Sequence, residues 1–197
     1  MDAPTLKAAL GRWADSMVRA APELNNLDGQ LGDGDLGATL SKCAANVQAA
    51  LPEMPDTLDG IFKSAAQACA KASGSSFGTL LAVAFLTVAK WAPPRQSLSR
   101  VDLAELVPHV IQTLSARGGA ALGDKTMLDS LNAIGQAIGA AHDGDDLRSA
   151  ARSAADAALA EFRGKPNRIG RARMFSEKSV GVEDPGMVAV LRMTEAL

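Results

Sequence analysis

Apolar side chains recur every three or four residues along most of the chain, which is the spacing of one face of an α-helix. In the first such stretch, Leu6, Leu10, Trp13, Met17 and Val18 form one stripe. Prolines, glycines and short polar runs interrupt the pattern and mark helix boundaries. The pattern predicts about eight helices, over residues 5–21, 39–51, 57–72, 77–90, 101–116, 127–142, 147–163 and 185–196.

The segments between these helices predict the architecture. Residues 25–37 hold four glycines and three aspartates and are expected to form a loop, whereas residues 170–181 fit no regular pattern. No stretch alternates convincingly between apolar and polar positions, so no β-strand is expected. Long helices with short connections favour antiparallel neighbours, and therefore a bundle or a closed ring. Without a visible linker or internal repeat, a single domain over residues 1–197 is expected.

Composition supports an all-α chain and excludes several function classes. The 197 residues include no tyrosine and only 4% aromatic residues, which argues against a β-sandwich. The net charge of −2 lacks the basic excess of a nucleic-acid-binding module. The longest uncharged apolar run, residues 77–89, is shorter than the roughly 20 residues of a membrane span, and no secretory signal is visible. A cytoplasmic protein with neither nucleic-acid nor membrane partners is expected.

Cysteine and histidine usage narrows the chemistry further. Cys43 and Cys69 lie in helical patterns and are expected to be buried free thiols, although the sequence leaves a bridge between them open. His109 and His142 are the only histidines, and neither has a partner nearby in sequence. A mechanism that needs several histidines, or a zinc site of cysteine and histidine, is therefore excluded.

The glycine-rich segment 27–37 carries the most chemical information. Asp28, Asp33 and Asp35 fall within eight residues, and glycines between them let the backbone turn so that the carboxylates converge. Three like charges close together are unfavourable unless a cation lies between them, and Mg²⁺ prefers carboxylates together with water and substrate phosphates. A solvated acidic turn is the alternative. An EF-hand is excluded because Ala44 stands where that loop requires glutamate.

Three further segments are weaker candidates. Residues 118–123 match a G-x-x-x-x-G spacing, but Asp124 stands where a P-loop needs lysine and no strand precedes it, so a P-loop is rejected. Glycines before a helix start can still face a phosphate. The serine-rich segment 73–76 is either a helix cap or an anion site, and Arg171 is either a phosphate ligand or an ordinary surface arginine.

Four segments follow one another in an order that identifies a family: LDGQLGDGDLG at 27–37, ASGSSFG at 72–78, GDKTMLD at 123–129, and a last segment at 170–186. Together they resemble the nucleotide-binding L subunit of dihydroxyacetone kinase, the DAK2 domain, over nearly the whole chain. The resemblance implies a closed barrel of about eight antiparallel up-and-down helices. It also implies ATP or ADP at one end, above two Mg²⁺ ions held by the acidic loop.

The resemblance assigns roles to particular positions of this sequence. Asp28, Asp33 and Asp35 match the Mg²⁺ ligands, and together with Arg171 they match the catalytic set. The positions matching nucleotide contacts are Leu36, Gly37, Ala38, Thr39, Ser73 and Gly74 at the phosphates, Gly118 and Met127 at the adenine, and Arg171, Asp184, Pro185 and Gly186 at the far side.

The function implied is phosphoryl transfer, which needs positioning and charge neutralisation rather than a side-chain nucleophile. In the family, a separate K subunit holds the ketose through a histidine that this chain lacks. The phosphoryl donor is ATP, or a phosphotransferase-system protein that recharges bound ADP, and a homodimer is also open. Two alternatives remain: a non-catalytic nucleotide-binding regulator, and a helical protein that binds a divalent metal for structure only.

Overall fold

A computed structural model describes residues 1–72, 75–93 and 95–197, and these residues form helices joined by short connections. No β-strand occurs among the described residues, where a lone β-bridge joins Asp2 to Ser97. The α-helices are α1 (Ala3–Leu31), α2 (Leu36–Ala50), α3 (Leu58–Lys71), α4 (Ser76–Trp91), α5 (Arg100–Gly118), α6 (Met127–Ala140), α7 (Leu147–Arg163) and α8 (Pro185–Thr194); two short 3₁₀ segments are η1 (Leu51–Glu53) and η2 (Arg171–Ser179).

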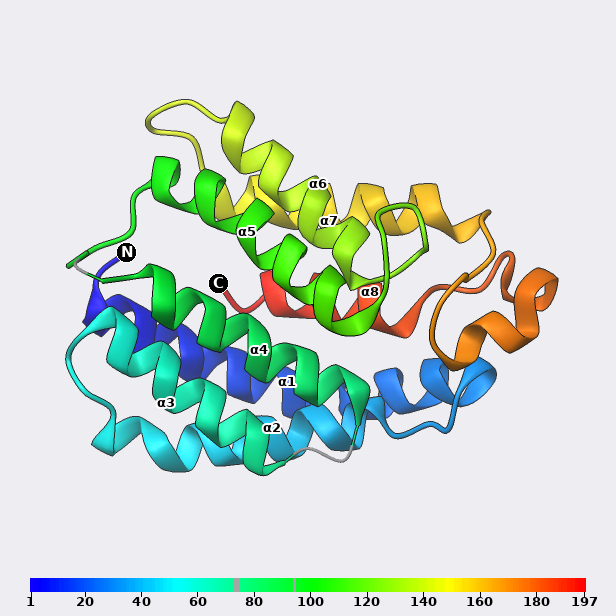
Figure 1. The fold of residues 1–197 in the computed structure, drawn as a ribbon, viewed down its shortest axis with the longest axis horizontal. Coiled ribbons are helices and arrows are strands. Elements are labelled where there is room, and N and C mark those ends of the chain that lie inside the picture. Colours follow the sequence, from blue (N-terminus) through cyan, green and yellow to red (C-terminus); the bar gives the residue numbers. More distant parts are fainter. Residues whose placement is uncertain (73–74, 94) are drawn as a thin grey trace.

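The helices close into a ring. Each helix packs against the next one along the chain, and α8 packs against both α7 and α1. Figure 1 shows successive helices running in opposite directions, so that their connections alternate between the two ends. All eight helices contribute side chains to one buried core, including Met17, Leu40, Ile61 and Leu114. The predicted all-α, up-and-down architecture is confirmed.

Helix α1 is longer than the sequence pattern predicts. The helix was expected to end at residue 21 and a loop to cover residues 25–37, but α1 continues through Pro22 to Leu31. The exposed side of the helix accommodates Pro22, while Leu24 and Leu31 are buried in the core. Their burial offsets the backbone hydrogen bond that the proline removes. The connection between α1 and α2 therefore shrinks to residues 32–35.

Helices α1 and α2 touch through their backbones at Gly37. A Cβ atom placed on Gly37 would lie 2.0 Å from the carbonyl oxygen of Ala21. No residue other than glycine permits this approach. The contact fixes the start of α2 against the last third of α1, and it thereby sets the distance across the acidic connection.

The structure also bears on the two cysteines and on membrane-spanning helices. Cys43 and Cys69 are free and fully buried, as the helical pattern around them predicts. Among the described helices, none is long and apolar enough to cross a membrane.

Candidate functional site

One end of the ring collects the connections that follow α1, α3, α5 and α7, because the helices alternate in direction. In Figure 1 the α1–α2 connection and η2 lie beside one another at this end. Close contacts join the starts of the even-numbered helices. A Cβ atom on Gly78 would lie 3.0 Å from Cγ2 of Thr39, and one on Gly186 would lie 3.4 Å from Cε2 of Phe77 and 3.8 Å from the nitrogen of Met127. The same end therefore carries the N-termini of α2, α4, α6 and α8.

Four helix N-termini at one end favour an anionic ligand. Each N-terminus carries a partial positive charge and leaves backbone N–H groups without partners inside the helix. Side-chain caps take up some of these groups: Ser75 accepts from Gly78, Thr126 from Leu128 and Asp184 from Met187. The field of the helices remains after capping, and a helix N-terminus binds anions such as phosphate groups.

The three aspartates of the acidic segment meet at this end. One carboxylate oxygen from each of Asp28, Asp33 and Asp35 lies within 4.8 Å of the others. Asp28 belongs to the last turn of α1, whereas Asp33 and Asp35 belong to the connection. Gly34 between them has a φ of +73°, a left-handed conformation that suits glycine. Hard oxygen ligands at this spacing fit the donor set that Mg²⁺ prefers.

The Asp28 carboxylate also holds the start of α2. Its Oδ2 accepts hydrogen bonds from the backbone N–H groups of Asp35 (2.8 Å) and Leu36 (3.3 Å). One turn earlier, Oδ1 of Asn25 accepts from the N–H of Ala38 at 3.0 Å. Sequence reasoning missed Asn25, although its place three residues before Asp28 puts both side chains on one helix face.

These caps change how the predicted phosphate contact at residues 36–39 can be made. The N–H groups of Leu36 and Ala38 are used by Asp28 and Asn25, and that of Thr39 bonds to the carbonyl of Asp35. The N–H of Gly37 has no hydrogen bond within the described part of the chain. A phosphate contact through the helix start would therefore be made first by Gly37.

Arg171 lies against the acidic cluster. Its Nη1 forms an ion pair with Oδ2 of Asp33, and both side chains are largely exposed. The sequence shows no basic residue near the three aspartates, so this partner becomes visible only when the α7–α8 connection folds over the α1–α2 connection. Within the described part of the chain, Arg171 therefore gives the cluster a cationic neighbour on its solvent side.

Lys125 is a buried structural residue at this end of the ring, and sequence reasoning did not single it out. Its side chain is fully buried, and its Nζ donates to the carbonyl oxygens of Lys165 (2.8 Å), Ser179 (2.9 Å) and Val182 (2.7 Å), with a longer contact to Arg163 (3.4 Å). Its backbone φ is +63°. Burial lowers the pKa of Lys125. The ammonium group thus anchors both ends of the connection that carries Arg171.

Asp184 and Asn167 complete this anchor. Asp184 caps α8 through the N–H of Met187 at 2.9 Å and accepts from Nδ2 of Asn167 at 2.8 Å. Nδ2 of Asn167 also donates to the carbonyl of Lys125, while Oδ1 of the same buried side chain has no partner in the described structure. Desolvation raises the pKa of Asp184 to about 6. Asp184, Pro185 and Gly186 therefore have a structural role in starting α8, beside any contact with a nucleotide.

The remaining predicted residues are placed as follows. Gly118 ends α5, where a Cβ atom would lie 3.4 Å from Cδ2 of Leu80, and Met127 is buried at the start of α6. Both lie at the same end of the ring as the aspartates, and their assignment to an adenine pocket stays a prediction. Ser73 and Gly74 lie outside the described residues.

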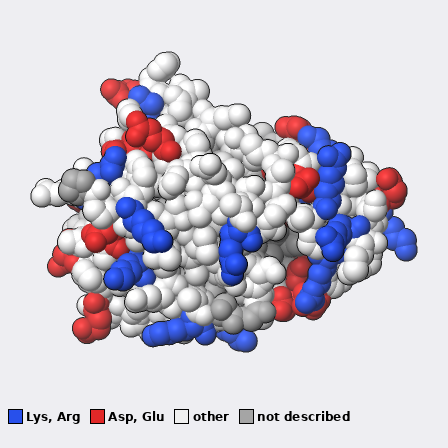
Figure 2. All heavy atoms as spheres, in the orientation of Figure 1, with Lys and Arg blue, Asp and Glu red and all other residues white. Residues whose placement is uncertain are grey.

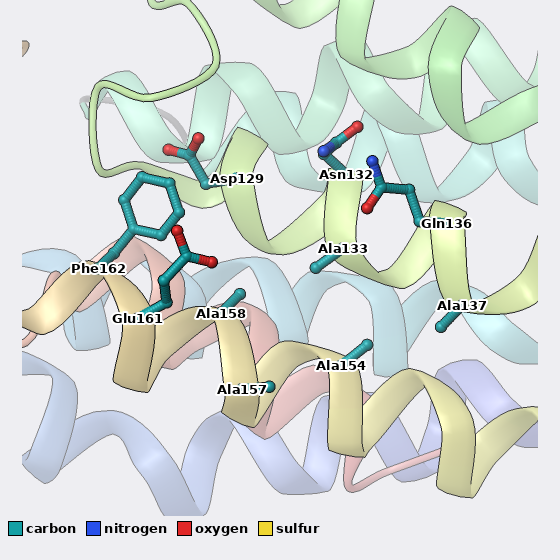
Figure 3. Close-up of a pocket in the computed structure, with 10 residues that line it drawn as sticks. All are labelled: Asp129, Asn132, Ala133, Gln136, Ala137, Ala154, Ala157, Ala158, Glu161 and Phe162. Carbon is teal, nitrogen blue, oxygen red and sulfur yellow. The ribbon is translucent and has the colours of Figure 1, made fainter.

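A groove lies elsewhere on the surface, between α6 and α7. This groove of about 360 Å³ is lined largely by alanines, with Asn132 and Gln136 on one wall and Glu161 on the other. Figure 3 shows Asp129 at one end of it. Both oxygens of Asp129 accept backbone N–H groups, from Gly123 and Thr126, in the cap of α6. The groove contains none of the three clustered aspartates and offers no comparable chemistry.

Comparison with known proteins identifies relatives over almost the full chain. Residues 30–197 match the family model of the DAK2 domain. The chain is 29% identical to the ADP-binding subunit of the PTS-dependent dihydroxyacetone kinase of Lactococcus lactis, over 95% of this chain and 92% of the relative. It is 28% identical to the ADP-binding subunit of the PEP-dependent enzyme of Escherichia coli, with the same coverage. Human triokinase/FMN cyclase is 33% identical over 95% of this chain but only 33% of the relative.

Solved structures show the same fold. The native dihydroxyacetone kinase of C. freundii superposes with a TM-score of 0.79 at 22% identity, and its complex with AMP-PNP and Mg²⁺ with a TM-score of 0.77 at 23% identity. Each comparison covers 100% of this chain and 34% of the solved chain. The chain thus spans about a third of the length of these solved chains.

Proposed function

The chain belongs to the DAK2 domain family, and we propose that it is the nucleotide-binding phosphotransfer subunit of a dihydroxyacetone-type kinase. One observation carries the proposal: three carboxylates converge within 4.8 Å at the end of the ring where four helices begin. Carboxylates suit a divalent cation and helix N-termini suit phosphates, so the two features together suit a metal-bound nucleotide. The ADP-binding subunits among the relatives support this reading.

In this proposal Asp28, Asp33 and Asp35 hold two Mg²⁺ ions together with the phosphates of ATP or ADP. Mg²⁺ bound there would neutralise phosphate charge and orient the group that is transferred. Gly37 offers its backbone N–H to a phosphate, and Gly118, Met127 and the turn at 184–186 surround the base and the far side of the nucleotide. The solved relative with AMP-PNP and Mg²⁺ supports the same pair of ligands.

Arg171 serves the transferred group rather than the fold. Its ion pair with Asp33 places a guanidinium at the edge of the carboxylate cluster. A planar guanidinium binds two phosphate oxygens at once, which stabilises the charge on a phosphoryl group during its transfer. The pair is exposed, so exchanging Asp33 for a phosphate costs little.

The acceptor is held by a partner. Within the described residues, no second group of acid–base side chains faces the acidic cluster, and a kinase must hold its acceptor hydroxyl in line with the phosphoryl group. We assign the acceptor, a ketose, to a K-type subunit that covers this end of the ring. The phosphoryl donor is ATP, or a phosphotransferase-system protein that recharges bound ADP.

The experiment that tests the proposal is a transfer assay with labelled ATP, Mg²⁺ and dihydroxyacetone. The purified chain alone should bind nucleotide and form no ketose phosphate. Adding a K-type subunit should start turnover, either with ATP or with a phosphotransferase-system donor. Product formed by the chain alone would show an acceptor site within it. Nucleotide binding without turnover under any of these conditions would instead favour the non-catalytic regulator.

A further inference from the structure

The α7–α8 connection carries a concentration of positive charge unlike the rest of the chain. We define the rim segment as residues 163–180, which includes η2. It holds six of the 20 basic residues, with Glu177 as its only acidic residue, although the whole chain has a net charge of −2. Figure 2 shows Lys and Arg side chains gathered in a band over the end of the molecule where this connection lies, with acidic side chains next to them.

Large apolar side chains are exposed on the same segment. Met174 is 73% exposed, Val180 41% and Phe175 37%. Leu122, 51% exposed, lies on the neighbouring α5–α6 connection, which the N–H of Arg168 joins through the carbonyl of Asp124 at 3.2 Å. Exposing a methionine and a phenylalanine in succession is unfavourable in water, and such clusters mark surfaces that other molecules cover.

The exposed side chains of the rim segment do not hold the fold together. The side chains of Arg173 and Lys178 make no hydrogen bond or ion pair within the described structure, and both residues are exposed. The segment is instead held from its inner side, where Nζ of Lys125 donates to the carbonyl oxygens of Lys165 and Ser179. Within the segment, the N–H of Asn167 donates to Oγ of Ser179. Its outer side chains are therefore available to a partner while its backbone is fixed.

We propose that the rim segment is a docking surface for a protein with an acidic face and an apolar socket, and that Arg173, Met174 and Phe175 enter this interface. The proposal rests on the proposed function and adds the surface on which the acceptor-holding partner binds. Because transfer requires the acceptor within about 3–3.5 Å of the phosphoryl group, the partner must cover the end that carries Asp28, Asp33 and Asp35. The rim segment flanks that end, since Arg171 touches Asp33.

The chemistry of the surface defines the partner. Arginine, methionine and aromatic residues are enriched at the centres of protein interfaces, where they supply most of the binding energy. An acidic face opposite the rim segment would also speed encounter by electrostatic steering. An anionic membrane fits less well, because the three aspartates beside the segment would repel its headgroups.

The test compares two matched double substitutions. Arg173→Glu with Met174→Asp reverses one charge and adds another on the rim segment. Val18→Asp with Arg19→Glu makes the same chemical change on α1, where Val18 is 53% exposed and Arg19 is exposed as well. For both variants and the wild type, Mg-ADP affinity of the isolated chain is measured by calorimetry. The Michaelis constant for the K-type subunit is measured in the transfer assay at two salt concentrations.

The rim variant should raise the Michaelis constant for the K-type subunit roughly tenfold or more, and weaken its salt dependence. Its Mg-ADP affinity should stay within about twofold of wild type, because neither side chain contacts the acidic cluster. The α1 variant should match wild type in both assays. A rim variant with an unchanged Michaelis constant overturns the docking surface while leaving the proposed function intact. Wild-type chain that binds nucleotide but never transfers with the K-type subunit overturns both.

A membrane partner is tested in the same variants. Wild-type chain and the rim variant are mixed with vesicles of phosphatidylglycerol and phosphatidylcholine, and binding is followed by co-sedimentation. Neither should bind at physiological salt. Vesicle binding that the rim substitutions abolish, together with normal transfer, would assign the surface to a lipid and overturn the protein partner.

Discussion

Arg171 and Asp33 form an ion pair that joins the α7–α8 connection to the α1–α2 connection. Both side chains are exposed, at 61% and 41%, so the pair adds little to stability. Its value is positional, because it places a guanidinium beside a carboxylate cluster that has no cation near it in sequence. The pair is weak enough for Arg171 to exchange the carboxylate of Asp33 for a phosphate.

Arg171→Lys tests this role. The substitution keeps the charge but loses the planar fork, so the transfer rate with the K-type subunit should fall roughly 10- to 100-fold. The melting temperature should change by no more than about 2 °C, because the pair is exposed. Arg19→Lys on α1 is the control. Normal transfer at an unchanged melting temperature would return Arg171 to the ordinary surface.

Asp33→Asn tests the metal assignment. With Mg²⁺ present, calorimetry should show ADP affinity falling roughly 10- to 100-fold, because one of three carboxylate ligands is lost. With EDTA in place of Mg²⁺, wild type and variant should bind ADP equally. Asp15→Asn, an exposed change on α1, serves as control. Equal affinity in all four titrations of wild type and Asp33→Asn would exclude these aspartates as the metal site.

The acidic part of the candidate site could be predicted from the sequence, because its residues lie close to one another in the chain. Asp28, Asp33 and Asp35 lie close in the chain, and intervening glycines make their convergence foreseeable. The contact of Arg171 with Asp33 depends on ring closure, which no local pattern encodes. The burial of Lys125 has no local signal in the sequence, since a charged residue is rarely expected to be fully buried. The sequence pattern predicts an end of the first helix at residue 21, because a proline usually ends a helix. In the structure, burial of Leu24 and Leu31 favours the continuation of α1.

Lys125→Met should destabilise the protein by roughly 2–4 kcal/mol, because the buried carbonyl oxygens that accept from Nζ lose their donor. Urea denaturation monitored by circular dichroism measures this difference. Lys63→Met, at an exposed position of α3, should change stability by less than about 0.5 kcal/mol. If both variants unfold at the same urea concentration, Lys125 does not anchor the connection between α7 and α8.

Titration of Asp184 should lower the free energy of unfolding as the pH rises from 4 to 7. Desolvation raises its pKa to about 6 in the folded chain, so between the unfolded and folded pKa values the native state binds more protons than the unfolded state. The stabilisation that this proton provides is full below the unfolded pKa and is lost as pH passes 6. The loss should amount to roughly 2–3 kcal/mol.

The Asp184→Asn variant isolates this effect from the other carboxylates. The difference in unfolding free energy between wild type and variant, measured by urea denaturation without nucleotide or metal, should shift against wild type as pH rises from 4 to 7. A difference that is constant over this range would show that Asp184 titrates normally in the folded chain.

Gly37→Ala should disturb both the fold and the site, because the start of α2 rests directly on the backbone of α1. The added methyl group would lie 2.0 Å from the carbonyl oxygen of Ala21, so the two helices must separate. The cost should be roughly 2–4 kcal/mol of stability. Separation also pulls the N–H groups of Asp35 and Leu36 away from Asp28, so Mg-ADP affinity should fall even where the variant remains folded.

Gly29→Ala is the matched control, since it makes the same chemical change one helical turn before the connection. A Cβ atom there would meet nothing closer than the Cα of Gly34 at 3.8 Å. Alanine is the better helix former, so this variant should be unchanged or more stable by up to about 1 kcal/mol, with normal Mg-ADP affinity. If Gly37→Ala and Gly29→Ala behave alike in denaturation and calorimetry, the backbone contact between α1 and α2 does not set the geometry of the acidic cluster.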